Sequence, residues 1–583
     1  MLDLSRYRDP KPAPRAVIDA LPERSARARF FVETPEGDFR AVTWGAYARE
    51  IRDVALFLAA SGLEKGERAA VFAPNRVAWM SAALGIQAAG GVMVPVYPAS
   101  TAAQAAYVVE HADARFLFVD TPALLRRVLE RFDAYANVER IVLLDDALDV
   151  APILAELRAA GKGLPDAAEV ERRFLPWSRA RALGAAKDAE ATGAFEERLA
   201  SVGLGDGAVM LYTSGTTGHP KGVPLTHGNV WTNGHDWLEV NAPLLREEAV
   251  DLLWLPMSHI FGFGEACLGN TLGFTTYLTE PARALDLLPV VRPDVFMSVP
   301  AYWEKLAQRA AQAGAGREAR RARLAEITGG RLSFCLSGGA GLKREVKELF
   351  HDAGLLIIEG YGLTECSPTL TMNRPSSFRF DSVGKPFPSV ELRLAEDGEI
   401  LAKGPSVFAG YHKDPAATRE VFTEDGWFKT GDVGRFTDDG FLQIIDRKKE
   451  ILVTAGGKNV PPANIELRFA GEPAISHVVV YGDGKKYLVA GVWLNHEGLD
   501  AELVKRGVPL EERSKAAEAA VEAAVARVNA ELASFEQVKR WRIMDAPLTV
   551  AGGLLTSTLK VRRKKVYEAF RRELEALYGE GAT

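Results

Sequence analysis

The sequence has few cysteines and no excess of basic residues. Three cysteines occur among 583 residues, far apart and without a CxxC pair: Cys267, Cys335 and Cys366. An odd number at this spacing argues against a disulfide framework or a cysteine-rich zinc site and favours a reducing cytoplasm. The formal net charge of −6 gives no general basic surface for phosphates, so nucleic acid is not an expected partner.

The sequence also lacks an export signal and an unbroken apolar span. Residues 1–17 carry charges and prolines where a secretory signal needs an apolar stretch. Residues 77–109 contain no charged side chain and are long enough to cross a bilayer. Their pattern nevertheless changes from helical to strand-like, and four residues interrupt it: Gly90, Gly91, Pro95 and Pro98. We therefore expect no transmembrane span.

The remaining composition is that of a globular protein, with 47% hydrophobic and 25% charged residues. The chain is longer than one hydrophobic core usually supports, which predicts two or more domains. From residue 26 to residue 278, short apolar runs alternate with helix-like stretches such as 46–62. This alternation predicts βαβ units and parallel sheets, with residues 145–197 as surface helices. No repeat of fixed period is present, which disfavours a solenoid or propeller.

The last part of the chain has a different pattern. Strand-like runs at 478–484 and 487–494 precede an alanine-rich helical stretch at 514–533 and a basic end. The predicted fold class is therefore α/β, in two domains. Residues 1–445 form a large N-terminal domain of βαβ-type parallel sheets packed with helices, and residues 446–583 form a small α+β C-terminal domain.

The most informative segment is VMLYTSGTTGHPKGVPLTH, residues 209–227. A strand-like run enters a loop of glycines and hydroxyl residues that contains Lys221. Glycines let backbone N–H groups approach a phosphate, hydroxyls donate hydrogen bonds, and the ammonium offsets charge. The spacing of Gly215 and Lys221 differs from a Walker P-loop. On composition alone, a solvated turn remains an open alternative.

Residues 212–223 resemble, throughout, the pattern YTSGTTGxPKGV of the adenylate-forming superfamily. That superfamily contains acyl-CoA synthetases, nonribosomal adenylation domains and firefly-type luciferases. The resemblance implies that Thr217 also lies near a magnesium ion. It assigns the triphosphate of ATP to Thr213, Ser214, Gly215, Thr216, Thr217 and Lys221.

A second segment, EGYGLTECSP at residues 359–368, resembles the family's YGxTE motif. There, Tyr361 would stack on adenine, Thr364 would approach the α-phosphate, and Glu365 would bind magnesium. An aromatic face suits a flat base, and a carboxylate can hold magnesium against phosphate oxygens. Gly360 and Gly362 belong to the same nucleotide-binding motif.

SGGAGL, residues 337–342, would be interpreted as a tight turn if it were considered alone. In the family, the matching segment forms the opposite wall of the adenine and acyl sites. The resemblance assigns Gly338, Gly339 and Ala340 to this wall.

A third segment covers residues 426–466. Its TGD gives Asp432 the family position that binds both ribose hydroxyls, and Arg447 would reach the same nucleotide. Asp446 aligns with the hinge about which a mobile small domain reorients. AGGKN resembles the loop that approaches the pantetheine of CoA, which involves Gly456, Gly457 and Lys458. Lys448 and Lys449 are interpreted as a solvated basic face.

The final segment, GGLLTSTLKVRRKKV at residues 552–566, resembles the family's C-terminal catalytic element. Its catalytic lysine would be Lys560, acting with Lys221, Thr364 and Glu365. A basic tail is ordinarily solvated, but the match to the LLTxTLK pattern favours a catalytic role for Lys560. Four cations flank this lysine, and their role in solubility or in weak attraction to an anionic membrane remains open. They are Arg562, Arg563, Lys564 and Lys565.

The residues of these motifs most resemble those of long-chain acyl-CoA synthetases. The resemblance implies that ATP and a fatty acid form acyl-AMP and pyrophosphate, after which CoA takes the acyl group. Mg²⁺ would accompany ATP, with Thr217 and Glu365 as ligands. A homodimer and peripheral contact of a cytoplasmic enzyme with membranes remain open.

The predicted acyl pocket is apolar and glycine-rich and includes residues 254–278 and 295–303. His259, Gly262 and Gly338 are the acyl-binding candidates, although a lone histidine in an apolar segment is more often a satisfied core residue. No aspartate stands where an amino-acid-activating domain would bind an ammonium. Many long-chain members carry an acidic residue soon after the SH pair, and Gly262 and Gly264 stand there instead, so chain length stays open.

Two other functions fit part of the sequence. An acyl-AMP ligase that loads a carrier protein would share all of these motifs, but the small-domain insertion frequent in such enzymes is not seen. A non-catalytic nucleotide- or acyl-binding relative would have no need of the retained Lys221, Glu365, Asp432, Arg447 and Lys560. A serine hydrolase is disfavoured because no GxSxG elbow occurs.

Overall fold

The computed structural model describes most of the chain. The described residues are 2–160, 164–213, 219–312, 314, 316–470, 472–496, 498–500, 508–509, 512–550, 552–556 and 560–579. Four predicted phosphate-binding residues therefore lie outside the described residues: Ser214, Gly215, Thr216 and Thr217.

The first large sheet is built from consecutive βαβ units, as the alternation of apolar runs and helical stretches predicts. Its strands are parallel except for β9, which returns antiparallel to β8. The spatial order is β7 (Phe174–Pro176), β6 (Arg140–Leu143), β5 (Ala114–Val119), β3 (Arg68–Phe72), β4 (Val92–Val96), β8 (Gly207–Thr213) and β9 (Lys221–Thr226).

A second large sheet has a parallel centre and antiparallel edges. Its order is β16 (Lys385–Pro386), β15 (Thr369–Met372), β14 (Ile357–Gly362), β13 (Phe334–Ser337), β12 (Val295–Ser298), β10 (Val250–Leu253), β11 (Thr275–Leu278), β1 (Ala28–Glu33) and β2 (Phe39–Thr43).

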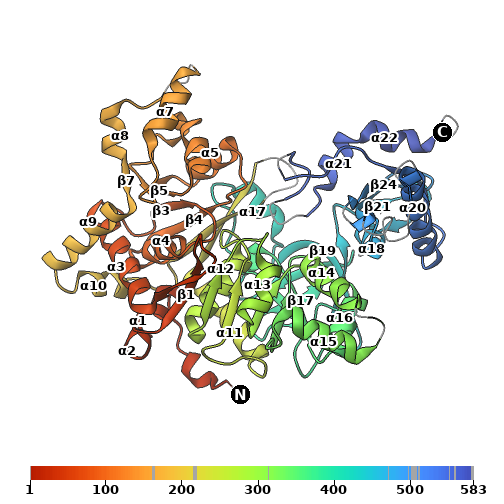
Figure 1. The fold of residues 1–583 in the computed structure, drawn as a ribbon, viewed down its shortest axis with the longest axis horizontal. Coiled ribbons are helices and arrows are strands. Elements are labelled where there is room, and N and C mark those ends of the chain that lie inside the picture. The colour runs from red at the N-terminus through yellow and green to blue at the C-terminus, as the bar shows by residue number, and fades with distance from the viewer. Residues whose placement is uncertain are drawn as a thin grey trace.

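Helices fill the space around both sheets (Figure 1). Residues on one face of β3, such as Val71, join the core that the two sheets share, whereas Phe72 joins a separate core on the outer face. The helices are α1 (Ala13–Ile18), α2 (Leu21–Arg24), α3 (Trp44–Ala60), α4 (Val77–Ala88), α5 (Ala102–His111), α6 (Pro122–Leu129), α7 (Val150–Ala159), α8 (Ala167–Arg173), α9 (Trp177–Glu190), α10 (Ala194–Ala200), α11 (His227–Asn241), α12 (Ile260–Leu272), α13 (Ala284–Val291), α14 (Pro300–Ala311), α15 (Arg317–Thr328), α16 (Arg344–Asp352) and α17 (Pro415–Val421), with 3-10 turns η1 (Leu4–Tyr7), η2 (Phe132–Tyr135) and η3 (Thr364–Cys366).

The uncharged stretch 77–109 folds into buried elements of this body. It contains α4, β4 and the start of α5, in agreement with the predicted change from helix to strand. Within the described residues, no helix combines the length and apolar character that a membrane crossing requires. The three cysteines are free, as their spacing predicted.

An antiparallel sheet that the alternation of strands and helices did not reveal follows the second large sheet. Its order is β17 (Glu391–Leu394), β18 (Glu399–Lys403), β19 (Phe428–Phe436) and β20 (Leu442–Arg447). The β19–β20 hairpin pairs Asp432 with Arg447 across the ladder. Two residues separated by a whole hairpin in the sequence therefore lie side by side.

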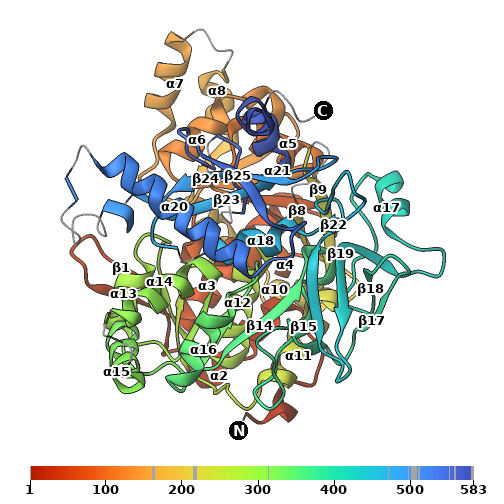
Figure 2. The same cartoon turned by 90° about the vertical axis from the view of Figure 1, so that its right-hand side faces the viewer.

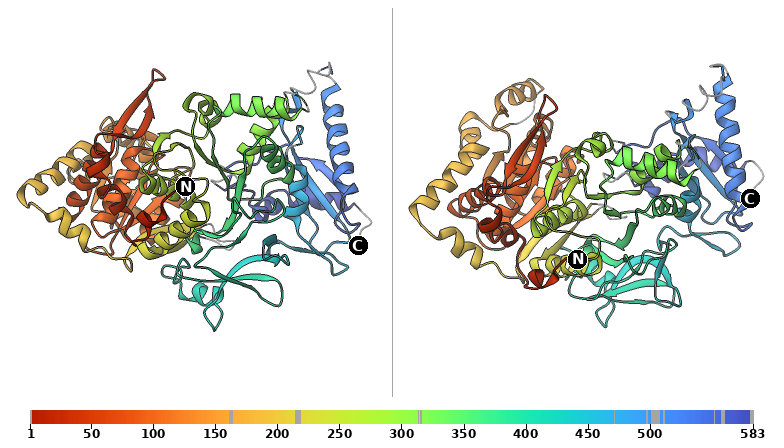
Figure 3. Two further views of the ribbon diagram at one scale, coloured as in Figure 1. Left: turned by 90° about the horizontal axis from the view of Figure 1, so that it is seen from below. Right: turned by 60° about the horizontal axis from the view of Figure 1, so that its bottom comes forward.

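The C-terminal elements form their own cores and lie at one end of the molecule's longest axis (Figures 1 and 3). Seen from that end, they lie in front of the large sheets (Figure 2). The elements are β21 (Leu452–Val453), β22 (Asn459–Val460), α18 (Pro462–Phe469), β23 (Ile475–Tyr481), β24 (Leu488–Leu494), α20 (Arg513–Ala530), β25 (Val538–Ile543), α21 (Arg563–Ala569), α22 (Arg571–Glu575) and η5 (Ala576–Tyr578). The mixture of strands and helices agrees with the predicted α+β character, and the boundary at residue 446 stays a prediction.

A charged cluster is buried where α12 packs on the second sheet. Arg29, Asp251 and Glu265 are each no more than 2% exposed. Arg29 donates to Thr276 Oγ1 at 2.6 Å, and the same hydroxyl donates to Asp251. Both oxygens of Glu265 and Oδ1 of Asp251 are buried without a hydrogen-bond partner among the described residues, and the charges of the two carboxyl groups interact. Burial raises the pKa of both carboxyls, and that of Glu265 further because Asp251 is beside it.

The raised pKa of Glu265 makes stability depend on pH. Above its unfolded pKa, the folded state holds a proton that the unfolded state releases, so stability falls as pH rises toward the folded pKa. Gln has no such proton to lose. We expect Glu265→Gln to show a melting temperature advantage over the parent that widens from pH 5 to pH 9. A constant difference across this pH range would contradict the raised pKa of Glu265.

Candidate functional site

The predicted nucleotide-binding residues lie at strand ends of both large sheets. Thr213 ends β8 and pairs with Lys221 at the start of β9. Gly338 follows the end of β13, and Tyr361 and Gly362 end β14. Carboxyl ends of strands are where open α/β sheets leave a crevice for ligands.

Asp432 connects β14 with the β19–β20 hairpin. Its side chain is 3% exposed. The Tyr361 hydroxyl donates a hydrogen bond to Asp432 Oδ2 at 2.5 Å, and Arg447 Nε lies 2.8 Å from Asp432 Oδ1. Burial raises the pKa of Asp432, while Arg447, Tyr361 and Lys560 oppose this shift. The structure thus brings together Tyr361, Asp432 and Arg447, as predicted.

Glu365 and Lys221 approach each other through Tyr411. Glu365 lies in η3 and is 8% exposed. Its Oε1 accepts a hydrogen bond from the Tyr411 hydroxyl at 2.9 Å, and Lys221 Nζ lies 4.7 Å from the centre of the Tyr411 ring. Burial raises the pKa of Glu365, and Arg447 opposes this shift. Sequence analysis missed Tyr411 because no motif marks this tyrosine.

Lys560 reaches this group from the C-terminal part of the chain. Its charge interacts with Asp432, Arg447 and His259. Lys560 is an exposed residue, although the surrounding protein partly desolvates its ammonium. This desolvation and the repulsion by Arg447 lower the pKa of Lys560, and Asp432 acts in the opposite direction. A lysine distant in the sequence thus stands among the predicted nucleotide-binding residues.

His259 is the N-cap of α12 and not a residue of a strand. Its Nδ1 accepts from the Phe261 backbone N–H at 3.2 Å. Desolvation and the nearby Lys560 charge lower the pKa of His259 to about 4, so the ring is neutral at pH 7. With Nδ1 as an acceptor, the neutral ring carries its proton on Nε2. His259 therefore has a ring N–H donor close to Lys560.

Several predicted glycines are required by close packing. A Cβ at Gly362 would lie 1.8 Å from the Pro368 carbonyl oxygen, and one at Gly262 would lie 2.4 Å from that of Pro256. A Cβ at Gly338 would lie 3.0 Å from the Phe261 ring. Gly339 adopts φ +86°, which favours glycine. Gly360 packs on β15, and Ala340 is exposed beside this wall.

Asp446 connects β20 to α18. Its Oδ1 accepts from the Arg447 backbone N–H at 2.7 Å, and its Oδ2 accepts from that of Ala463 at 3.0 Å. The second bond caps the first turn of α18, where N–H groups otherwise lack partners. The side chain of the predicted hinge residue thus bonds only to backbone that follows it, in β20 and at the start of α18.

Two cations of the basic segments have specific carboxylate partners. Arg563, for which solubility or membrane attraction was left open, is 7% exposed and binds both oxygens of Glu466 as well as Glu450. Its position in a buried ion-pair network argues against either role. Lys448 binds Glu399 at 2.7 Å but is an exposed residue, in agreement with its interpretation as part of a solvated face.

The predicted CoA-binding residues lie on an exposed turn between β21 and β22: Gly456, Gly457 and Lys458. Lys458 Nζ lies 6.0 Å from the centre of the Phe535 ring. Among the described residues, no recorded contact joins this turn to Asp432, Glu365 or Lys560. The structure does not bring the turn into the group around Asp432.

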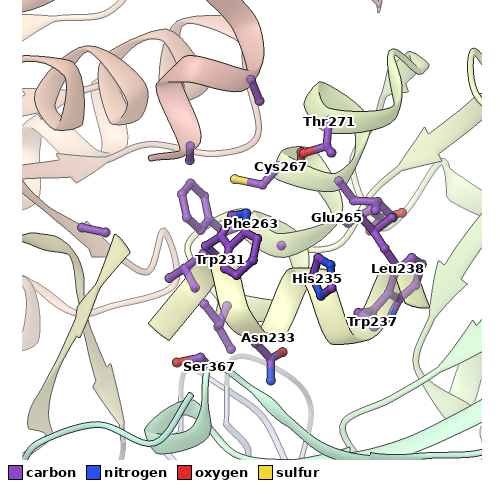
Figure 4. Close-up of a pocket in the computed structure, with 18 of the residues that line it drawn as sticks. Trp231, Asn233, His235, Trp237, Leu238, Phe263, Glu265, Cys267, Thr271 and Ser367 are labelled. Atoms are coloured by element: carbon purple, nitrogen blue, oxygen red, sulfur yellow. The ribbon is translucent and has the colours of Figure 1, made fainter. Parts of the chain in front are cut away.

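An apolar cavity lies between α11 and α12 (Figure 4). Its lining includes Trp231, Leu238, Phe263, Met297 and Leu336. At one end it includes the 367–369 segment that follows Glu365, together with Phe261, which packs on Gly338. Gly264 also lines the cavity, and a Cβ there would meet no atom within 4 Å. A larger side chain at this position would occupy the cavity.

Comparisons with known proteins agree with this architecture. Residues 18–412 match the family model "AMP-binding enzyme", and residues 449–582 match "AMP-binding enzyme C-terminal domain". The long-chain-fatty-acid–CoA ligase FadD15 of Mycobacterium bovis is 34% identical over 592 aligned residues, which cover 93% of each chain. The human long-chain-fatty-acid–CoA ligase 6 is 29% identical, over 92% of this chain and 82% of the relative.

Solved structures share the fold. The adenylation and carrier didomain of the carboxylic acid reductase of Segniliparus rugosus, in complex with AMP, superposes with a TM-score of 0.79 at 21% identity, covering 99% of this chain and 83% of that one. The anthranilate CoA ligase AuaEII with anthranoyl-AMP gives 0.74 at 20% identity, covering 98% and 99%. The two family models together span most of the chain, and the chain therefore belongs to the AMP-binding enzyme family.

Proposed function

We propose that this protein is an AMP-forming fatty acid–CoA ligase. The observation that carries the proposal is the meeting of Lys560 with Asp432, Arg447 and His259 beside the end of an apolar cavity. Family membership and the named activity of relatives at 34% identity support it. In this proposal residues 1–445 bind ATP and the acid, and residues 446–583 bring Lys560.

ATP would lie among the residues around Asp432. The buried carboxylate of Asp432 can accept from both ribose hydroxyls, with Arg447 alongside. Tyr361 offers a ring for adenine, and Lys221 offers an ammonium for the phosphates. Glu365, a buried oxygen donor, fits the hard ion Mg²⁺. Bound there with ATP, Mg²⁺ would offset phosphate charge; Thr217, the second predicted ligand, lies outside the described residues.

In the first step, an oxygen of the acid attacks the α-phosphorus of ATP. A bond forms between this oxygen and phosphorus, and the bond to pyrophosphate breaks. Two anions must meet, so preorganised cations stabilise the transition state most where negative charge accumulates. Lys560 and Lys221 supply such charges from two sides, and the Nε2–H of neutral His259 can donate to the acid. Thr364 is proposed to bind the α-phosphate.

In the second step, the thiol sulfur of CoA attacks the acyl carbonyl, a thioester forms, and AMP leaves. The turn with Gly456, Gly457 and Lys458 is proposed to contact pantetheine in this step. Because the charge of Lys560 acts on Asp432 and Arg447, the arrangement seen here suits acid activation. Reorientation about Asp446 would exchange Lys560 for this turn.

The apolar cavity supports a fatty acid as the acid. Each methylene buried there contributes about 0.8 kcal/mol, so longer chains are favoured strongly over acetate until the cavity is full. The absence of a side chain at Gly264 leaves space on the cavity side of α12, whereas Gly262 packs against Pro256. Homodimer formation and peripheral contact with a membrane stay predictions.

The first test is a panel of acids from acetate to palmitate, assayed for AMP release with and without CoA. We expect CoA-dependent thioester formation that increases with chain length over the short acids. Failure to form a thioester with any acid would refute the ligase. Pyrophosphate exchange without thioester formation would favour the alternative, a ligase that loads a carrier protein.

The second test separates the two steps. Lys560→Ala should slow acyl-AMP formation by about a hundredfold or more, which is typical for loss of one group that stabilises transition-state charge. Thioester formation from supplied acyl-AMP should change little. Lys565→Ala, which removes an exposed lysine of the same segment, is the matched control. Equal loss of both steps would contradict the proposed role of Lys560.

The third test concerns the bond between Tyr361 and Asp432. Tyr361→Phe keeps the ring but removes a hydrogen bond to a charged group, which is typically worth about 1.5–3 kcal/mol. We expect the KM for ATP to rise at least about tenfold, with a smaller change in the KM for the acid. Tyr361→Leu, which also lacks the ring, should raise the KM for ATP further. Equal KM values for Phe and Leu variants would exclude a contribution of the ring to ATP binding.

A further inference from the structure

A segment near the start of the chain covers the end of the cavity that is remote from Glu365. We call residues 7–16 the strap. Five strap residues besides Tyr7 line the cavity: Asp9, Lys11, Pro12, Ala13 and Ala16. Asp9 is exposed, Lys11 is half-buried and Pro12 is buried. The strap therefore runs from the protein surface down to the apolar lining.

Polar contacts fix the outer end of the strap to the body of the protein. The hydroxyl of Tyr7 donates to Glu247 Oε1 at 2.6 Å. The neighbouring Arg6 donates to both oxygens of Glu247, at 2.8 and 2.9 Å. The buried Arg24 lies 3.5 Å from the same carboxylate. Charge-assisted bonds of this kind hold a segment in one position more firmly than apolar contact alone.

The inner end of the strap is the first part of α1. Pro14 and Val17 are buried, and α1 packs against α4 and α12. Ala13 and Ala16, one turn apart, face the cavity with the smallest apolar side chain. The opposite wall carries Cys267 and Thr271 of α12, which line the cavity as well (Figure 4). Small residues on one wall leave space that bulkier ones would fill.

The orientation of an acyl chain in this cavity follows from its two ends. The carboxylate must lie at the end that adjoins Gly338 and the 367–369 segment, since the reacting phosphate is there. The hydrocarbon tail then runs between α11 and α12 toward the strap. For an acid long enough to reach it, the strap is the last wall that the chain meets.

We infer that the strap sets the chain length of the acid, with Ala13 and Ala16 as specificity-determining residues at the distal wall. This inference rests on the proposed function. The strap contacts neither ATP nor the reacting carboxylate, so it acts through the fit of the tail alone. Its effect must therefore grow with chain length and vanish for acids too short to reach α1.

The test is the ratio of kcat/KM for long and short acids in Ala16→Phe. We expect the longest acids that the parent accepts to lose at least about tenfold, since two methylene contacts are together worth about that factor. Short acids should keep their kcat/KM within about twofold. The same profile is expected for Ala13→Phe, which adds a ring one turn away on the same wall.

Arg15→Phe is the matched control, because it places the same ring on α1 at a residue that does not line the cavity. Its profile should equal that of the parent. A uniform loss over all acids, an unchanged profile in both cavity variants, or the same shift in Arg15→Phe would each overturn the inference. A parent that forms no fatty acyl thioester would instead refute the proposed function. Unchanged activity with short acids shows that each variant is folded.

Discussion

The arrangement of the site depends on the carboxylate of Asp432. Its two oxygens bind side chains from different sheets, Tyr361 from β14 and Arg447 from β20. Burial makes an isolated carboxylate costly, and these two partners, with the Lys560 charge, are what allow it to remain there. Arg447, which pairs with Asp432, also acts electrostatically on Glu365. Charges that no single motif brings together thus form one electrostatic unit.

The resemblance of short motifs to a known family predicted much of this unit, because its residues lie in short segments that keep their local geometry. Thr213 and Lys221 flank one hairpin, and Asp432 and Arg447 pair across another. The alternation of apolar runs likewise indicated the parallel strands and the small α+β region. In each case the deciding contacts are local or follow from strand periodicity.

The missed features depend on contacts between distant segments. Tyr411 bonds to Glu365 from 46 residues away, and Arg563 pairs with Glu466 from 97 residues away. The strap lines a cavity formed mostly by α11 and α12. The strands of the β17–β20 sheet pair antiparallel and do not form βαβ units. Nothing in the local composition of these residues distinguishes a buried partner from a solvated one, because burial is decided by packing over the whole chain.

The ion pairs of Arg563 have a mechanical consequence. Arg563 follows Lys560 by three residues and is anchored to Glu466 on α18, and α18 is capped by Asp446. Glu466 in turn accepts from the backbone of Val480 in β23. The segment that carries Lys560 is therefore anchored, three residues further on, to the packed core of the C-terminal elements. In the proposed reorientation about Asp446, these ion pairs would make Lys560 move together with α18 and β23.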